Sequence, residues 1–174
     1  MVTYLNALAW TVTGTQAYAN KAITFMDSWA STIKAHNNTN SPLQSGWVAS
    51  TWARAAELIR YSNAGWSAAS ITKFEGMLRN VYLPLVKDGA PNYMGNWDLV
   101  MAEAAIFIGV FLDDQTVYDA GMTKFLNRVP AYIYLESDGN LPKTAPGDTT
   151  TNTISLFGAS HGSVIPRPLG SFGI

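Results

Sequence analysis

The chain has 174 residues, of which 48% are hydrophobic and 13% are charged, and it contains no cysteine. This length fits one domain with a substantial core, and the lack of cysteine excludes disulfides and thiolate metal sites. Because 11 Lys and Arg residues nearly balance 12 Asp and Glu residues, the chain lacks the basic excess that nucleic-acid binding requires. The low share of charge favours self-association or assembly into something larger.

Apolar residues recur at helical spacing along the first half of the chain. Core-type residues at positions 5–10 predict that the chain opens within a helix, and they do not form the charged start and apolar stretch of a signal peptide. A glycine stop then precedes a second helix, predicted over residues 15–34. Residues 36–46 are rich in Asn, Ser, Thr and Pro, so we expect a loop there before a helix over 47–61.

The second half continues the helical pattern. A helix predicted over 67–82 should end before Pro84, because the residue that precedes a proline disfavours the helical conformation. After a glycine-containing loop comes a strongly apolar helix over 96–111, whose stripe from Trp97 to Phe111 should face the core. The last clear helix is predicted over 115–127.

These elements predict an all-α fold of stacked antiparallel helical hairpins, since no segment shows a convincing strand pattern. Residues 129–135 either extend the last helix past a proline or form a separate turn. We expect residues 1–143 to form the helical domain and residues 144–174, which lack any sustained period, to form an irregular tail. The longest apolar run is interrupted by Glu103 and is shorter than the roughly 20 residues that a membrane span needs, so we expect no membrane partner.

The usual catalytic motifs are missing from the sequence. Its two histidines, His36 and His161, stand far apart without metal-ligand spacing, and it has neither a G-x-S-x-G turn nor a phosphate-binding glycine loop. Glu103 lies within an apolar helix, and we interpret it as the buried ion-pair partner of Arg54 rather than as a general acid. We therefore expect no metal and no cofactor.

Polar and aromatic residues instead gather at two predicted helix starts. They are His36, Gln44 and Trp47 around the first start, and Asn92, Asn96 and Trp97 around the second. If the hairpins stack side by side, the two groups face each other across a groove. Indole faces flanked by amides suit a sugar ring, and helix starts favour an acidic one because their unpaired N–H groups point outward. The alternative is that the amides are helix caps and the two indoles are core residues.

The same residues carry a resemblance to the alginate lyase superfamily of polysaccharide lyases. The matching segments, between about residue 5 and residue 143, include Ala9-Trp10, Gln44-Ser45-Gly46-Trp47, Trp52-Ala53-Arg54-Ala55-Ala56-Glu57 and Gly95-Asn96-Trp97-Asp98-Leu99. The resemblance implies a partial (α/α) toroid that cleaves uronic acid polymers by β-elimination without a cofactor.

Roles for individual residues also follow from this resemblance. It implies that Asn96 neutralises the substrate carboxylate, with Asn92 as the alternative position, and that His36 contributes to proton transfer. Gln44, Trp47 and Trp97 would line the subsites.

After residue 143 the sequence departs from the family, whose members continue through helices that bring a second His, an Arg and the catalytic Tyr. The ending here resembles that of a truncated gene product. Three functions stay open: a lyase for an alginate- or glucuronan-type polysaccharide, a non-catalytic remnant that binds acidic oligosaccharides, or a helical scaffold for other proteins. We also expect self-association through exposed apolar helix faces.

Overall fold

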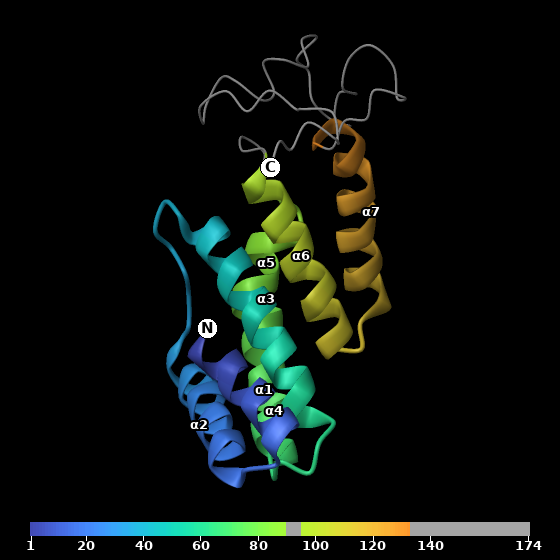
Figure 1. Ribbon diagram of the computed structural model, residues 1–174. Coiled ribbons are helices and arrows are strands. Elements are labelled where there is room, and N and C mark those ends of the chain that lie inside the picture. The colour runs from blue at the N-terminus through green and yellow to red at the C-terminus, as the bar shows by residue number, and fades with distance from the viewer. Residues whose placement is uncertain (90–94, 133–174) are drawn as a thin grey trace, which may run out of the picture.

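The computed structural model describes residues 1–89 and 95–132, and every regular element within these ranges is helical. The elements, shown in Figure 1, are α1 (Val2–Thr13), α2 (Gln16–Thr32), α3 (Ser41–Arg60), α4 (Ala68–Met77), η1 (Leu78–Tyr82), α5 (Leu83–Val86), α6 (Asn96–Phe111) and α7 (Gln115–Tyr132). The all-α prediction is confirmed. The predicted tail at 144–174 and residue Asn92 lie outside the described residues.

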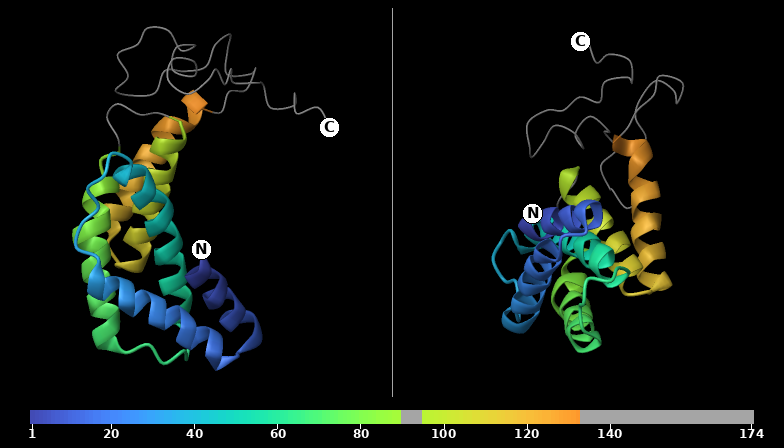
Figure 2. Two further views of the ribbon diagram at one scale, coloured as in Figure 1. Left: turned by 90° about the vertical axis from the view of Figure 1, so that its left-hand side faces the viewer. Right: turned by 60° about the horizontal axis from the view of Figure 1, so that its bottom comes forward.

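Helix α3 forms the centre of the molecule. The α1–α2 hairpin packs on one side of it and the α6–α7 hairpin on the other, while α4, η1 and α5 run behind it as one continuous rod (Figures 1 and 2). Helices α3 and α6 both begin at the upper end of the bundle in Figure 1. This arrangement brings the two helix starts that carry the polar and aromatic residues to the same end of the molecule.

The core joins these hairpins through aromatic rings. Phe74 is fully buried and contacts three other rings, with centroid distances of 5.8 Å to Trp52, 5.5 Å to Trp66 and 5.7 Å to Phe111. The predicted core stripe of α6 is also buried. No helix in the described ranges is long and apolar enough to cross a lipid bilayer.

Two predicted helix boundaries are wrong, and proline explains both. Helix α3 begins at Ser41 rather than at Trp47, because Pro42 occupies its first turn, where a missing N–H costs nothing. Pro84 does not end the rod behind α3 either. The π-helical turn η1 precedes it, with the Leu83 N–H donating to the Leu78 carbonyl, and this wider turn accommodates the proline ring.

The end of α7 decides between the two alternatives for the residues that follow position 127, an extended helix or a separate turn. Helix α7 continues to Tyr132, so the residues around Pro130 extend it rather than form a separate turn.

Glycine sets the distance between α6 and α7. A Cβ atom at Gly109 would lie 2.5 Å from the backbone nitrogen of Tyr118. We expect Gly109→Ala to lower the free energy of unfolding by about 1–3 kcal/mol, because the neighbouring backbone cannot move away without separating the hairpin. Chemical denaturation measures this change.

Gly76 on α4 supplies the matched control for that experiment. The nearest atom to a Cβ at this position is 4.0 Å away, so Gly76→Ala has room. It should be neutral or stabilise the protein by up to about 1 kcal/mol through helix propensity. Equal losses for both variants would contradict the assigned role of the α6–α7 contact.

Glu57 on α3 carries an unfavourable charge. Its Oε2 atom is buried without a hydrogen-bond partner among the described residues, and burial raises the pKa of the carboxyl above its ordinary value of 4.5. The Arg60 charge opposes this shift and the Asp113 charge adds to it. A raised pKa means that the folded state favours the protonated carboxyl more than the unfolded state does. The protonated carboxyl therefore stabilises the folded state below pH 4.5, and this stabilisation is lost as the pH rises through the raised pKa.

We therefore expect Glu57→Gln to be more stable than the wild type at neutral pH, and this advantage to shrink as the pH falls. Thermal melting across this pH range tests the sign. A variant that is less stable at neutral pH would show that the Glu57 charge is favourably paired.

Candidate functional site

A pocket of about 570 Å³ lies between α3, α6 and α7. We call it the Asn96 pocket; its described lining residues are Trp47, Asn96, Leu99, Val100, Glu103, Ile106, Phe107, Met122 and Phe125. The α6 members stand at positions 96, 99, 100, 103, 106 and 107, which lie on one face of that helix. The pocket is lined by one amide, one indole and one carboxylate, that of Glu103, together with apolar side chains.

The pocket brings together two of the residues that the sequence singles out. Trp47 is 53% exposed on α3, and Asn96 is an exposed residue in the first turn of α6. Gly46 explains how α3 approaches α6 at this point, since a Cβ there would lie 2.9 Å from the side chain and 3.2 Å from the carbonyl oxygen of Val100. The glycine that precedes Trp47 is therefore a helix-contact residue.

The start of α6 is favourable for an anion. Gly95 caps the helix at φ 67° and its carbonyl accepts the Leu99 N–H, so the positive end of the helix dipole lies beside Asn96. This end of the dipole favours a negatively charged ligand.

A charge network anchors this end of α6 to α7. Asp98 is buried, and the Nε atom of Arg128 lies 3.2 Å from its carboxylate. Lys124, which like Arg128 lies on α7, is also partly buried. This burial lowers the pKa of its amine, and the nearby Asp98 charge opposes that shift. The network holds the two pocket walls that α6 and α7 provide.

Three other predicted site residues, Trp97, Gln44 and His36, are not among the described residues that line the Asn96 pocket. Trp97 is 5% exposed and belongs to the core, so the core alternative holds for this indole and fails for the exposed Trp47. Gln44 is half-buried and its side-chain oxygen accepts from Asn38 at 3.0 Å. Asn92 lies outside the described residues. His36 is half-buried with its Nε2 atom 3.3 Å from the Tyr82 hydroxyl, and it is not among the described residues that line the pocket.

The predicted ion pair is present but is not buried. An Arg54 guanidinium nitrogen lies 3.3 Å from Glu103, and the two side chains are 33% and 40% exposed. The guanidinium also lies near the rings of Tyr4 and Phe107, at 5.4 and 4.8 Å from their centroids. The pair is open to solvent because α6 turns the Glu103 face toward the pocket rather than toward the core.

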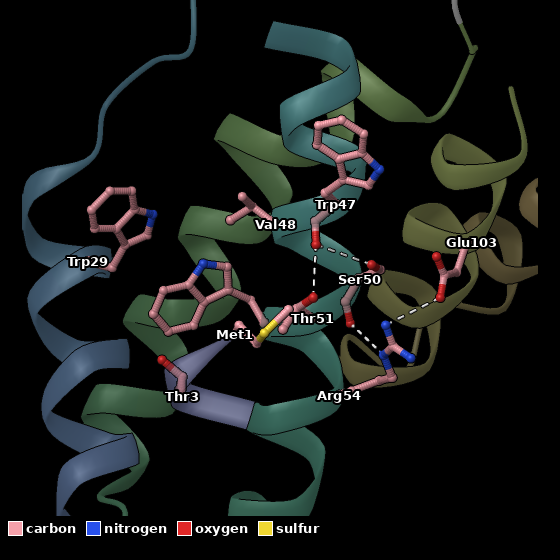
Figure 3. A pocket seen from close by; sticks show the side chains of 10 residues that line it. Met1, Thr3, Trp29, Trp47, Val48, Ser50, Thr51, Arg54 and Glu103 are labelled. Carbon is pink, nitrogen blue, oxygen red and sulfur yellow. Dashed lines mark hydrogen bonds and ion pairs between the residues drawn. The ribbon is translucent and has the colours of Figure 1, made fainter. Parts of the chain in front are cut away.

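A second cavity of about 630 Å³ adjoins this ion pair (Figure 3). We call it the Trp29 cleft; its described lining residues are Met1, Thr3, Trp29, Trp47, Val48, Ser50, Thr51, Trp52, Arg54 and Glu103. Trp47 and Glu103 line both cavities, so the two are neighbours along one face of the molecule. No group of three or more His, Cys, Asp or Glu side chains in the described part of the chain could hold a metal ion.

Comparison with known protein families gives one match. A sequence model described as alginate lyase matches residues 1–145. The chain belongs to the alginate lyase family. The resemblance seen in the sequence is thereby confirmed, and the domain is polysaccharide lyase-like. The searches of curated proteins and of solved structures found no match.

The sequence did not predict that residues of α7 line the pocket of this alginate lyase family member. Met122 and Phe125 line it, although they carry no polar group that would mark a site. Their only signal is their three-residue spacing on an amphipathic helix, which is equally typical of a core stripe. Packing of α7 against α6 alone determines that they face a cavity.

Proposed function

We propose that this protein acts on a uronic-acid-containing polysaccharide of the alginate or glucuronan type, which it cleaves by β-elimination. One observation carries the proposal: the exposed indole of Trp47 and the amide of Asn96 line one pocket at the start of α6. An indole face stacks on the C–H face of a pyranose, and an amide donates to its carboxylate. The family membership supports a polysaccharide as substrate.

The chemistry explains why an amide is needed. In β-elimination a base removes the C5 proton of a uronate, the C4–O bond breaks, and a C4–C5 double bond forms while the departing sugar oxygen gains a proton. The C5 proton is weakly acidic because the adjacent carboxylate is already negative. A hydrogen bond from the Asn96 amide, together with the positive end of the α6 dipole, stabilises the additional charge that develops on the carboxylate.

None of the described residues that line the pocket is Tyr or His, and the carboxylate among them, Glu103, is paired with Arg54. His36 was the expected contributor, but its ring contacts Tyr82, with the two ring centroids 5.3 Å apart. This observation favours a second candidate function, in which the chain binds acidic oligosaccharides without cleaving them.

Two measurements separate these functions. The purified protein is incubated with alginate and with glucuronan while the ultraviolet absorbance of the unsaturated product is followed, and calorimetry measures the binding of saturated oligouronides. A rising absorbance supports the lyase, and binding with a flat absorbance supports the non-catalytic remnant. A flat absorbance together with no heat of binding rejects both.

A further inference from the structure

Trp29 is partly exposed to solvent, but its polar N–H group is directed toward a partner within the protein. Its indole is 40% exposed in the Trp29 cleft, yet its Nε1–H donates to the Tyr82 hydroxyl at 2.7 Å. The ring also stacks on Trp52, with centroids 6.3 Å apart and planes 18° from parallel. The polar atom of Trp29 is therefore already satisfied, and the exposed remainder of the side chain is apolar.

Tyr82 holds this indole in place from within the core. Tyr82 is fully buried, and burial raises the pKa of its phenol, so its hydroxyl keeps its proton. The Tyr82 hydroxyl accepts the Trp29 N–H, and the Nε2 atom of His36 lies within hydrogen-bond distance of the same hydroxyl, at 3.3 Å. These bonds fix the orientation of the ring before any ligand arrives, which lowers the entropy cost of binding.

The opposite wall of the cleft carries an ion pair, Arg54 with Glu103, whose guanidinium is held in place by two contacts. The Arg54 Nε atom donates to the Ser50 carbonyl at 3.1 Å, while Glu103 contacts another guanidinium nitrogen at 3.3 Å (Figure 3). The guanidinium lines the cleft and is one third exposed. An acidic sugar would thus meet an apolar face on one side and a guanidinium on the other, and guanidinium groups bind carboxylates well.

We propose that the Trp29 cleft is a second saccharide subsite, which binds another uronate of the same polymer whose reacting unit occupies the Asn96 pocket. Trp29 provides the stacking face, Arg54 binds the carboxylate, and Trp47, which lines both cavities, lies between the two sugars. The identity of the ligand rests on the proposed function. The role of His36 here is to position Trp29 through Tyr82, not to move a proton at the substrate.

The test compares affinity across oligomer length. Calorimetry measures the dissociation constants of saturated oligouronides from the disaccharide to the hexasaccharide, for the wild type and for Trp29→Ala. We expect the wild type to bind longer oligomers more tightly, and Trp29→Ala to bind the hexasaccharide about tenfold more weakly while its affinity for the disaccharide is unchanged. Unchanged disaccharide binding also shows that the variant is folded.

Tyr18→Ala is the matched control, since Tyr18 is an equally exposed aromatic residue on α2 that does not line the cleft. It should bind every oligomer like the wild type. Tyr82→Phe should reproduce part of the length-dependent loss, because it removes the hydroxyl that holds Trp29.

The outcomes separate this subsite from the proposed function. Hexasaccharide binding that Trp29→Ala leaves unchanged, or weakens to the same degree as disaccharide binding, overturns the second subsite. If the wild type binds oligouronides but its affinity does not depend on their length, the second subsite is rejected while the Asn96 pocket stands. If the wild type binds no uronide of any length, both proposals are rejected.

Discussion

Asn96→Ala is expected to lower the rate of β-elimination by about 100- to 1,000-fold, the usual cost of removing one hydrogen-bond donor to a developing negative charge. In the proposed reaction the amide contributes most in the transition state, where the substrate carboxylate carries additional charge. The loss should therefore appear in kcat more than in KM. Asn96 is exposed in the first turn of α6, so the alanine variant should keep its fold. Initial rates from ultraviolet absorbance over a range of polymer concentrations measure both constants.

Asn6→Ala serves as the control for this variant. Asn6 is a half-buried residue on α1 whose side-chain amide donates locally, to the Val2 carbonyl at 2.8 Å. Its replacement should leave kcat and KM unchanged. An Asn96→Ala variant with wild-type kcat would show that the carboxylate is neutralised elsewhere, and the assignment of the Asn96 pocket as the reaction centre would be wrong.

Phe74→Ala should be the most destabilising change considered. Phe74 is fully buried, and its ring lies between those of Trp52, Trp66 and Phe111, which belong to different parts of the bundle. Truncation would leave a cavity that three rigid rings cannot collapse to fill, so we expect a loss of about 3–5 kcal/mol in the free energy of unfolding. Denaturant unfolding followed by tryptophan fluorescence measures it.

Two further variants test whether this loss reflects the cavity. Phe74→Leu keeps most of the side-chain volume and should cost clearly less than Phe74→Ala. Tyr61→Ala truncates an aromatic residue that is 67% exposed, and it should cost less than about 1 kcal/mol. A small effect of Phe74→Ala would mean that the aromatic cluster does not join the hairpins.

The site was only partly predictable, and the two tryptophans show why. Trp47 and Trp97 both follow helix-start signals, and the sequence offers each of them the same two roles, core residue or sugar platform. In the structure Trp47 is 53% exposed and Trp97 is 5% exposed. Their burial depends on which face of each helix its neighbours cover, and this is a property of packing rather than of local sequence.

His36 shows the same limit for a polar residue. Its position in the chain, shortly before a helix start rich in amides, suggests a role at the substrate. In the fold it lies against Tyr82, which occupies a π-helical turn that no sequence pattern announced. The ring partner comes from 46 positions away, so local sequence could not identify it.

The sequence by itself determined the helical class, most helix ranges and the family, because periodic apolar residues and short motifs are local properties. It also paired Arg54 with Glu103, since opposite charges on two apolar helices have few other partners. Only the tertiary structure decided that α3 and α6 meet at Gly46, that Trp47 and Asn96 therefore share a pocket, and that Trp29 opens into an adjoining cleft. Cavities form where packed helices leave a face uncovered, and that depends on contacts between residues far apart in the chain.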